Sequence, residues 1–76
     1  MEKLVEYVAK ALVEHPENVE VEISHESETE KIIALRVAPE DRGRVIGKNG
    51  RTAHAIRTLL SAASPEGKNV SLDIVD

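Results

Sequence analysis

Gly47 and Gly50 interrupt a basic segment in the stretch Arg42-Gly-Arg-Val-Ile-Gly-Lys-Asn-Gly-Arg-Thr52. Gly47 and Gly50 flank Lys48 and Asn49, and helical patterns precede and follow them. Glycine adopts a positive φ at little cost and lets another backbone approach closely. A helix that begins after Gly50 would direct its free N–H groups and its positive dipole end at this loop. The loop is therefore predicted to be an anion site.

The charge of the chain is distributed unevenly around this loop. The 76 residues hold 14 acids and 10 Lys plus Arg, and the net charge of −4 by itself argues against a nucleic-acid partner. Residues 1–41 hold 11 acids and 4 bases, residues 42–65 hold 5 bases and no acid, and residues 66–76 hold 3 acids and 1 base. The balances are therefore −7, +5 and −2. A phosphate ligand is expected at the basic central third.

Helical and strand periodicities alternate on both sides of the loop. The predicted elements are a helix that stops at Pro16, a strand over 19–24, a hairpin tip over 25–30, a strand over 32–37, a short helix from Pro39 to about residue 46, a helix after Gly50 that ends at Ser64-Pro65, and a strand over 70–74. The positions predicted to face the core are Leu4, Val5, Val8, Ala11, Leu12, Val19, Val21, Ile23, Ile33, Leu35, Val37, Ala53, Ile56, Leu60, Ala63, Val70, Leu72 and Ile74.

The element order α-β-β-α-α-β predicts one α+β domain with two layers. Three short strands need a cover on their apolar face, and three helices with apolar stripes can supply it. The expected architecture is a three-stranded mixed sheet with three helices packed on one face. The other face should meet water and carries Glu20, Glu22, Arg36 and Asp73, with Arg36 paired to glutamates. No linker or repeat divides the chain, so residues 1–76 are expected to form a single domain.

Composition and spacing argue against several functions. The absence of Cys excludes disulfides, thiolate nucleophiles and zinc–thiolate sites. His15, His25 and His54 lack metal-ligand spacing, and the alternating Glu26, Glu28 and Glu30 fit a solvated hairpin tip better than a metal site. The loop lacks the spacing of a nucleotide P-loop, and no serine has a nucleophile-elbow context. We therefore expect no enzyme, metal, cofactor or small-molecule substrate. No apolar run approaches the ~20 residues that span a bilayer, so no membrane partner is expected.

The segment Val45-Ile-Gly-Lys-Asn-Gly50, within this element order, resembles a type II KH domain, the type found mainly in bacteria. KH domains clamp the backbone of about four nucleotides with a Gly-x-x-Gly loop. The short length and the sequence Gly47-Lys-Asn-Gly-Arg-Thr-Ala-His-Ala-Ile-Arg-Thr-Leu-Leu60 are also similar to the small single-KH proteins of the KhpA type. The resemblance implies a cytoplasmic RNA-binding protein that acts as an RNA chaperone or post-transcriptional regulator. It further implies that the protein acts together with a larger KH-containing partner and is linked to cell-wall biogenesis and cell shape.

The resemblance assigns the loop role to residues 47–50 and an apolar role to Ile46 before them. The predicted RNA-binding set is Arg44, Val45, Ile46, Gly47, Lys48, Asn49, Gly50, Arg51, Thr52, His54 and Ile56. In this set the three cations at 44, 48 and 51 neutralise phosphates, and the aliphatic side chains form a groove for bases. Many KH motifs carry Ile where this chain has Ala53, which could make the groove shallower or bring the helices closer. Arg42 and Arg57 fit either phosphate contact or a solvated helix surface.

Two functions remain open on these grounds. The first is a non-enzymatic module that grips single-stranded RNA at the Gly47–Gly50 loop. The second is a protein-interaction subunit, a homodimer or a heterodimer with a larger KH protein, that has little RNA affinity of its own. Its candidate interfaces are the last strand and the Ala-rich helix that follows Gly50.

Overall fold

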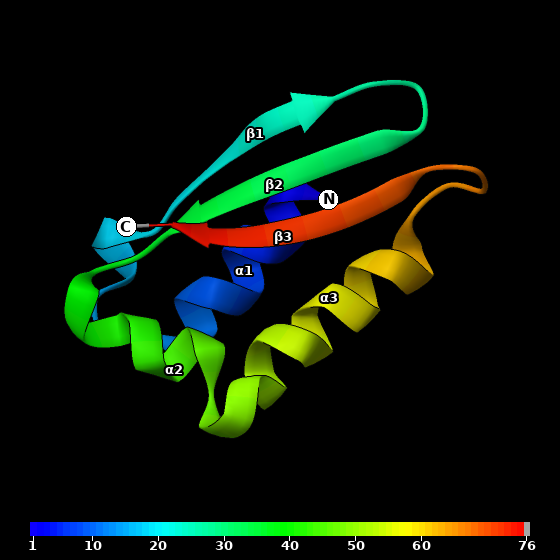
Figure 1. The fold of residues 1–76 in the computed structure, drawn as a ribbon. Helices are drawn as coiled ribbons and strands as arrows, with labels where there is room; N and C mark the ends of the chain where they lie inside the picture. The colour runs from blue at the N-terminus through cyan, green and yellow to red at the C-terminus, as the bar shows by residue number, and fades with distance from the viewer. Residues whose placement is uncertain (76) are drawn as a thin grey trace.

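The computed structural model describes residues 1–75, and its elements follow the predicted order (Figure 1). The helices and strands are α1 (Glu2–Leu12), β1 (Glu20–Glu26), β2 (Glu30–Arg36), α2 (Arg42–Ile46), α3 (Arg51–Ala63) and β3 (Asn69–Val75). Short 3₁₀ turns at Pro16–Asn18, Pro39–Asp41 and Lys48–Gly50 connect them. In the first two of these turns proline occupies the first position. Its fixed φ suits a helix there, and its missing N–H is not needed.

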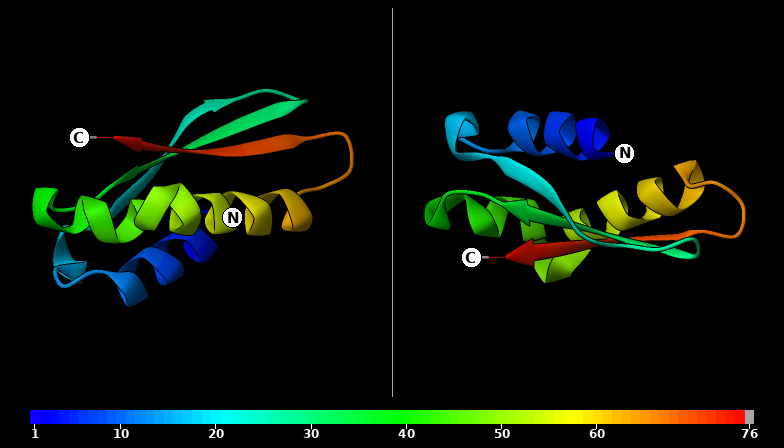
Figure 2. Two further views of the ribbon diagram at one scale, coloured as in Figure 1. Left: turned by 60° about the horizontal axis from the view of Figure 1, so that its bottom comes forward. Right: turned by 90° about the horizontal axis from the view of Figure 1, so that it is seen from above.

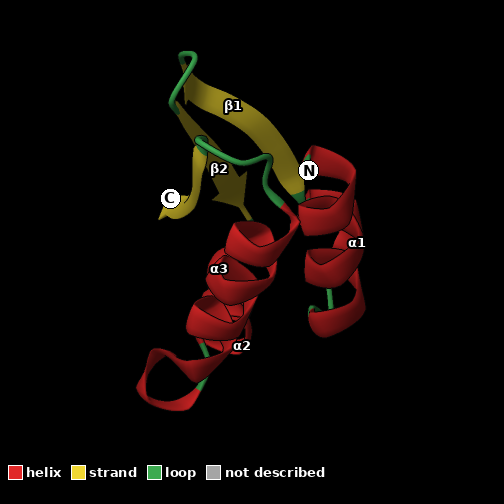
Figure 3. Cartoon of the chain, turned by 90° about the vertical axis from the view of Figure 1, so that its right-hand side faces the viewer, coloured by secondary structure: helices red, strands yellow, loops and turns green. Residues whose placement is uncertain are grey.

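The sheet is mixed and has the strand order β1-β2-β3. β1 pairs antiparallel with β2 through a hairpin, whereas β3 runs parallel to β2, with Leu72 opposite Ile33. Parallel neighbours need a crossover connection, and α2, the glycine loop and α3 form it. The helices lie on one side of the sheet (Figure 2), and α1 and α3 run side by side there (Figure 3). The predicted two-layer α+β fold is confirmed.

The core lies between the two layers and draws on every helix and strand except β1. Its buried members are Val5, Ala9, Val19, Ile33, Leu35, Val37, Val45, Ile56, Leu60, Val70 and Leu72. Ile33, Leu35, Val45 and Leu60 are fully buried. Because α2 and α3 both contribute to this core, the loop between them is anchored on both sides.

Some core predictions were wrong. Ile23 is 41% exposed although it lies opposite the buried Ile33, because β1 is an edge strand with no neighbouring strand on its outer side. Leu4, Ala11 and Leu12 are exposed because the buried stripe of α1 runs through Val5 and Ala9. Ala63 is exposed in the last turn of α3, beyond Leu60, which is the last buried position of that helix.

Asp41 is the only charged side chain buried among residues 1–75. Its Oδ1 accepts a hydrogen bond from the Glu14 backbone N–H at 3.1 Å, and its Oδ2 accepts one from the His15 N–H at 2.9 Å. Two charge-assisted hydrogen bonds offset the free-energy cost of removing the carboxylate from water. Asp41 thereby ties the segment after α1 to the start of α2, which leads into the loop.

Ion pairs join elements at the surface. Arg36 Nη1 lies 3.4 Å from Glu20 Oε2, which confirms the predicted pairing of Arg36 with a glutamate. Lys31 on β2 donates a hydrogen bond from Nζ to Glu2 Oε2 of α1 at 2.8 Å. This hydrogen bond lowers the pKa of Glu2 from its ordinary 4.5 to about 2.

We expect Glu2→Gln to reduce the free energy of unfolding slightly at neutral pH. Because the folded pKa of Glu2 is depressed, the contribution of its carboxylate is present above pH 4.5 and is lost as the pH falls towards about 2. Urea unfolding of the wild type and the variant at several pH values measures this difference. Glu28→Gln, in the exposed hairpin tip, is the control. A difference between wild type and Glu2→Gln that persists unchanged at the acid end would contradict the assignment.

Candidate nucleic-acid interface

The glycine loop turns sharply between α2 and α3. Gly47 ends α2 with φ 76° and ψ 173°, Gly50 precedes α3 with φ 73° and ψ 12°, and Asn49 has φ 57° and ψ 29°. Asn tolerates the left-handed region better than most non-glycine residues. The Gly50 N–H donates to the Gly47 carbonyl at 3.2 Å, and the Gly47 N–H donates to the Gly43 carbonyl at 2.8 Å. The loop is therefore an ordered turn, and its two glycines occupy conformations that favour glycine.

The two glycines are needed for different reasons. A Cβ built on Gly47 would lie 2.2 Å from Thr52 Oγ1, so the Thr52 side chain occupies the space beside Gly47. A Cβ on Gly50 would meet no other atom within 4 Å. The surroundings of Gly50 are thus open to an approaching backbone, whereas Gly47 is enclosed by its own chain. The sequence did not indicate this packing role of Thr52.

The N-terminus of α3 faces the loop without a side-chain cap. Gly50 is its N-cap residue and its first turn contains no acid. The first backbone N–H groups of a helix lack partners within the helix and carry the positive end of its dipole. Lys48 and Arg51 are exposed beside this helix end, and neither forms an ion pair with any residue of the 1–75 segment. Anions are therefore favoured here by two full charges and a helix dipole.

Arg44 is the exception among the predicted loop cations. Its Nη2 lies 2.5 Å from Glu14 Oε1, and its Nε lies 3.9 Å from Asp41 Oδ1. Residues 42–65 contain no acid, as the sequence shows, but the fold brings two acids from the preceding segment against this basic segment. Arg44 therefore differs from Lys48 and Arg51 in having acidic partners, both of which come from outside residues 42–65.

The predicted apolar groove is reduced to one exposed side chain at the loop. Ile46 is 37% exposed, whereas Val45 and Ile56 are buried in the core. Both buried residues support α2 and α3 from within, and neither side chain lies on the surface. Ala53, in the first turn of α3, is also buried.

The other candidate residues are divided between surface and support. His54 is exposed in the first turns of α3, and Thr52 is half-buried against Gly47. Arg57 donates from Nε and Nη2 to the Leu72 carbonyl, each at 3.3 Å, and so connects α3 to β3. Arg42 is half-buried at the start of α2.

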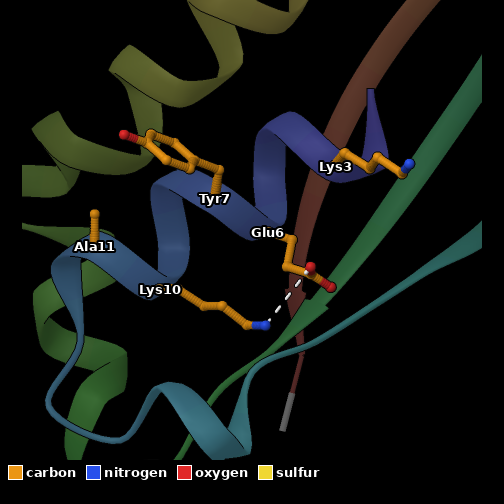
Figure 4. A pocket seen from close by; sticks show the side chains of 5 residues that line it. All are labelled: Lys3, Glu6, Tyr7, Lys10 and Ala11. Carbon is orange, nitrogen blue, oxygen red and sulfur yellow. Dashed lines mark ion pairs between the residues drawn. The ribbon is translucent and has the colours of Figure 1, made fainter.

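No other site competes with the loop in the described part of the chain. No group of three or more His, Asp or Glu within residues 1–75 is placed to hold a metal ion. Within the same residues, no helix is both long and apolar enough to cross a membrane. An open hollow of about 500 Å³ lies on α1 (Figure 4) and is lined by Lys3, Glu6, Tyr7, Lys10 and Ala11. In this hollow the Glu6–Lys10 ion pair points away from the Tyr7 ring, so no polar groups converge on one point.

Comparisons with known proteins agree with the fold. The family model described as KhpA/KhpB, KH domain, matches residues 2–74. The protein named RNA-binding protein KhpA of Caldanaerobacter subterraneus is 53% identical over 76 residues, which cover 99% of this chain and 100% of the relative. Proteins of the same name from Halalkalibacterium halodurans and Clostridium perfringens are 47% and 49% identical over 77 residues, covering 99–100% of this chain and 100% of each relative. No solved structure gave a significant match. The chain therefore belongs to the KhpA/KhpB family of KH domains.

Proposed function

We propose that this chain is a non-enzymatic RNA-binding protein that grips single-stranded RNA at the Gly47–Gly50 loop, with residues 1–76 acting as one KH domain. The observation that carries the proposal is the ordered positive-φ turn in front of an uncapped helix N-terminus. Lys48 and Arg51 stand beside it without acidic partners among residues 1–75. The names of its relatives, RNA-binding protein KhpA, support the same ligand.

The loop residues have separate proposed roles. The open space at Gly50 admits the sugar–phosphate backbone, and Lys48 and Arg51 neutralise phosphates. Asn49, held in the left-handed region, presents its amide at the turn. The exposed Ile46 offers an apolar contact to a base. No stacking aromatic is needed, because KH domains hold bases against aliphatic surfaces.

The remaining predicted residues support this surface. His54 follows the loop on α3, where it can contact the same strand of RNA, and Arg44 precedes the loop on α2. Thr52, Val45 and Ile56 act by fixing the loop and its two helices. The acidic residues 1–41 repel RNA, so binding is confined to the basic edge and to one orientation.

We further propose a cytoplasmic protein that acts as an RNA chaperone or post-transcriptional regulator, with a role in cell-wall biogenesis and cell shape. These roles rest on the resemblance to the KhpA type. One KH domain contacts only about four nucleotides, so its affinity is expected to be modest. A homodimer, or a heterodimer with a larger KH-containing protein, would add avidity. Light scattering of the chain with and without RNA tests the homodimer, and an RNA-free dimer with negligible RNA affinity would favour the interaction-subunit function instead.

The double substitution Lys48→Asp and Asn49→Asp tests the loop assignment. We expect at least about tenfold weaker binding of a short single-stranded RNA, because the loop loses a phosphate-neutralising charge and gains two repelling ones. For the wild type, three to four neutralised phosphates predict a log–log salt slope of about −2 to −3, and the variant slope should be shallower. Fluorescence anisotropy of labelled RNA at several salt concentrations measures both quantities.

The matched control for this experiment is Lys3→Asp with Asn18→Asp. Both residues are exposed and lie outside the loop, and the pair makes the same change in net charge. Equal weakening by the two double variants would reveal a long-range charge effect only. Unchanged binding by the loop variant would overturn the loop assignment.

A further inference from the structure

An acidic side chain from outside the basic segment is bound to Arg44, one turn before the glycine loop. Glu14 Oε1 accepts a hydrogen bond from Arg44 Nη2 at 2.5 Å, across 30 residues of chain. The side chains of Arg44 and Glu14 are 53% and 64% exposed, so water and solutes reach the pair. Arg44 is thus accessible, but its guanidinium already has a carboxylate partner.

The backbone that bears this carboxylate is held by a buried side chain. The Glu14 N–H donates to the buried Asp41 Oδ1, and the next N–H, of His15, donates to Oδ2. Asp41 directly precedes α2, and Arg44 lies three residues later on that helix. The buried Asp41 therefore holds the backbone of Glu14 next to the start of the helix that carries Arg44. The contact is held by the fold, and Glu14 does not lie on a loose surface segment.

A guanidinium binds carboxylates and phosphates with the same set of N–H donors. An RNA phosphate that approaches Arg44 along the loop must therefore compete with Glu14 for these donors. Building on the proposed RNA-binding function, we propose that Glu14 is an intramolecular competitor that occupies Arg44 in place of an RNA phosphate. Glu14 thereby lowers RNA affinity and makes Arg44 a weaker phosphate contact than Lys48 or Arg51.

This competition has a defined salt dependence. An exposed ion pair is weakened by added salt, because screening reduces the attraction between its charges. The disadvantage that Glu14 imposes on RNA binding is therefore largest at low salt and declines as salt is raised. Long-range repulsion by the acidic residues 1–41 is screened in the same way, so a control for general charge is required.

Glu14→Gln tests the proposal. Glutamine keeps a carbonyl acceptor for Arg44 but removes the charge that competes with phosphate. We expect RNA binding about 1.5- to 5-fold tighter than wild type at low salt, the range that corresponds to an exposed ion pair. Glu17→Gln is the matched control, because it makes the same charge change three residues later and its carboxylate lies near His15 (3.5 Å).

A double-mutant cycle isolates the contact with Arg44. In an Arg44→Ala background, Glu14→Gln should change RNA affinity no more than Glu17→Gln does. Equal effects of the two glutamine substitutions in the wild-type background would overturn the competition. Weaker binding by Glu14→Gln would also overturn it, because Glu14 would then orient Arg44 for RNA.

The loop variant distinguishes a failure of RNA binding at the loop from a failure of the competition at Arg44. If Lys48→Asp with Asn49→Asp weakens RNA binding while Glu14→Gln and Glu17→Gln act alike, the proposed function stands and the competition fails. If the loop variant binds RNA as the wild type does, the loop function fails and the competition at Arg44 fails with it. Circular dichroism of each variant confirms that the changes in affinity occur in folded protein.

Discussion

Replacement of Gly47 with alanine is expected to lower the free energy of unfolding by about 3–5 kcal/mol. Two effects contribute. The backbone at φ 76° and ψ 173° lies in a region occupied almost only by glycine. The new Cβ would also lie 2.2 Å from Thr52 Oγ1 and 2.8 Å from the Thr52 backbone nitrogen, so the side chain cannot simply rotate away. A domain of this size has only about 4–11 kcal/mol in total, and a large unfolded fraction is expected.

Gly50→Ala is the matched control for this prediction. Gly50 has a similar φ of 73°, but a Cβ there has open space around it. Only the left-handed conformation is then penalised, and about 1–2 kcal/mol is expected. Urea unfolding followed by far-ultraviolet circular dichroism gives both values. Equal losses for Gly47→Ala and Gly50→Ala would contradict the packing of Thr52 against Gly47.

A second variant keeps the prediction testable if Gly47→Ala does not fold. The double variant Gly47→Ala with Thr52→Ala removes the Thr52 hydroxyl, the nearest atom to the new Cβ, but retains the close Thr52 Cβ and backbone nitrogen and the unfavourable φ. It should recover part of the lost stability and should unfold at a higher temperature than Gly47→Ala alone. No recovery would show that contact with the Thr52 hydroxyl contributes nothing to the loss.

Asp41→Ala is expected to lower the free energy of unfolding by about 3–4 kcal/mol, because hydrogen bonds to charged groups contribute about 1.5–3 kcal/mol each. The substitution leaves the N–H groups of Glu14 and His15 without their acceptor in a site where Asp41 is only 1% exposed. Asp41→Asn should cost less, about 2 kcal/mol, since one oxygen remains while the amide NH₂ faces the other N–H.

The neighbouring acid provides the control for Asp41. Glu40 lies in the same 3₁₀ turn, so both acids experience the same helix dipole, but Glu40 is exposed. Glu40→Gln should therefore change stability little. Amide hydrogen exchange of Glu14 and His15 should accelerate in Asp41→Asn beyond the change seen for the core strands. Unchanged exchange at these two amides would show that their hydrogen bonds to Asp41 do not protect them, even if the free energy of unfolding fell.

The fold could be predicted because its signals are local. The prolines at 16, 39 and 65 and the glycines at 47 and 50 mark the ends of elements, and periodicity identifies what lies between them. The exposure of Ile23 could not be predicted, since alternation along β1 does not reveal that this strand lies at the edge of the sheet. A strand pattern identifies a strand, whereas burial depends on what packs over it.

The candidate site shows the same division between local and distant contacts. The turn at the Gly47–Gly50 loop follows from glycine conformations, so its residues could be named from the sequence. The partner of Arg44 lies 30 residues away at Glu14, and the partners of Asp41 lie 26 and 27 residues away. Asp41 could be recognised only as an acid in a first helical turn, and its burial depends on how α1 and α2 meet.

The parallel pairing of β2 with β3 has a consequence for the synthesis of the protein on the ribosome. Ile33 and its neighbour Leu72 are separated by 39 residues, so the hairpin and all three helices emerge before the strand that completes the sheet. Until β3 emerges, Val70 and Leu72 are missing from the core under α3, and Arg57 lacks the Leu72 carbonyl that it binds. Long-range parallel contacts form late in folding. We therefore expect a nascent chain to expose its glycine loop before that loop is rigid, and to acquire RNA-binding competence only when β3 docks.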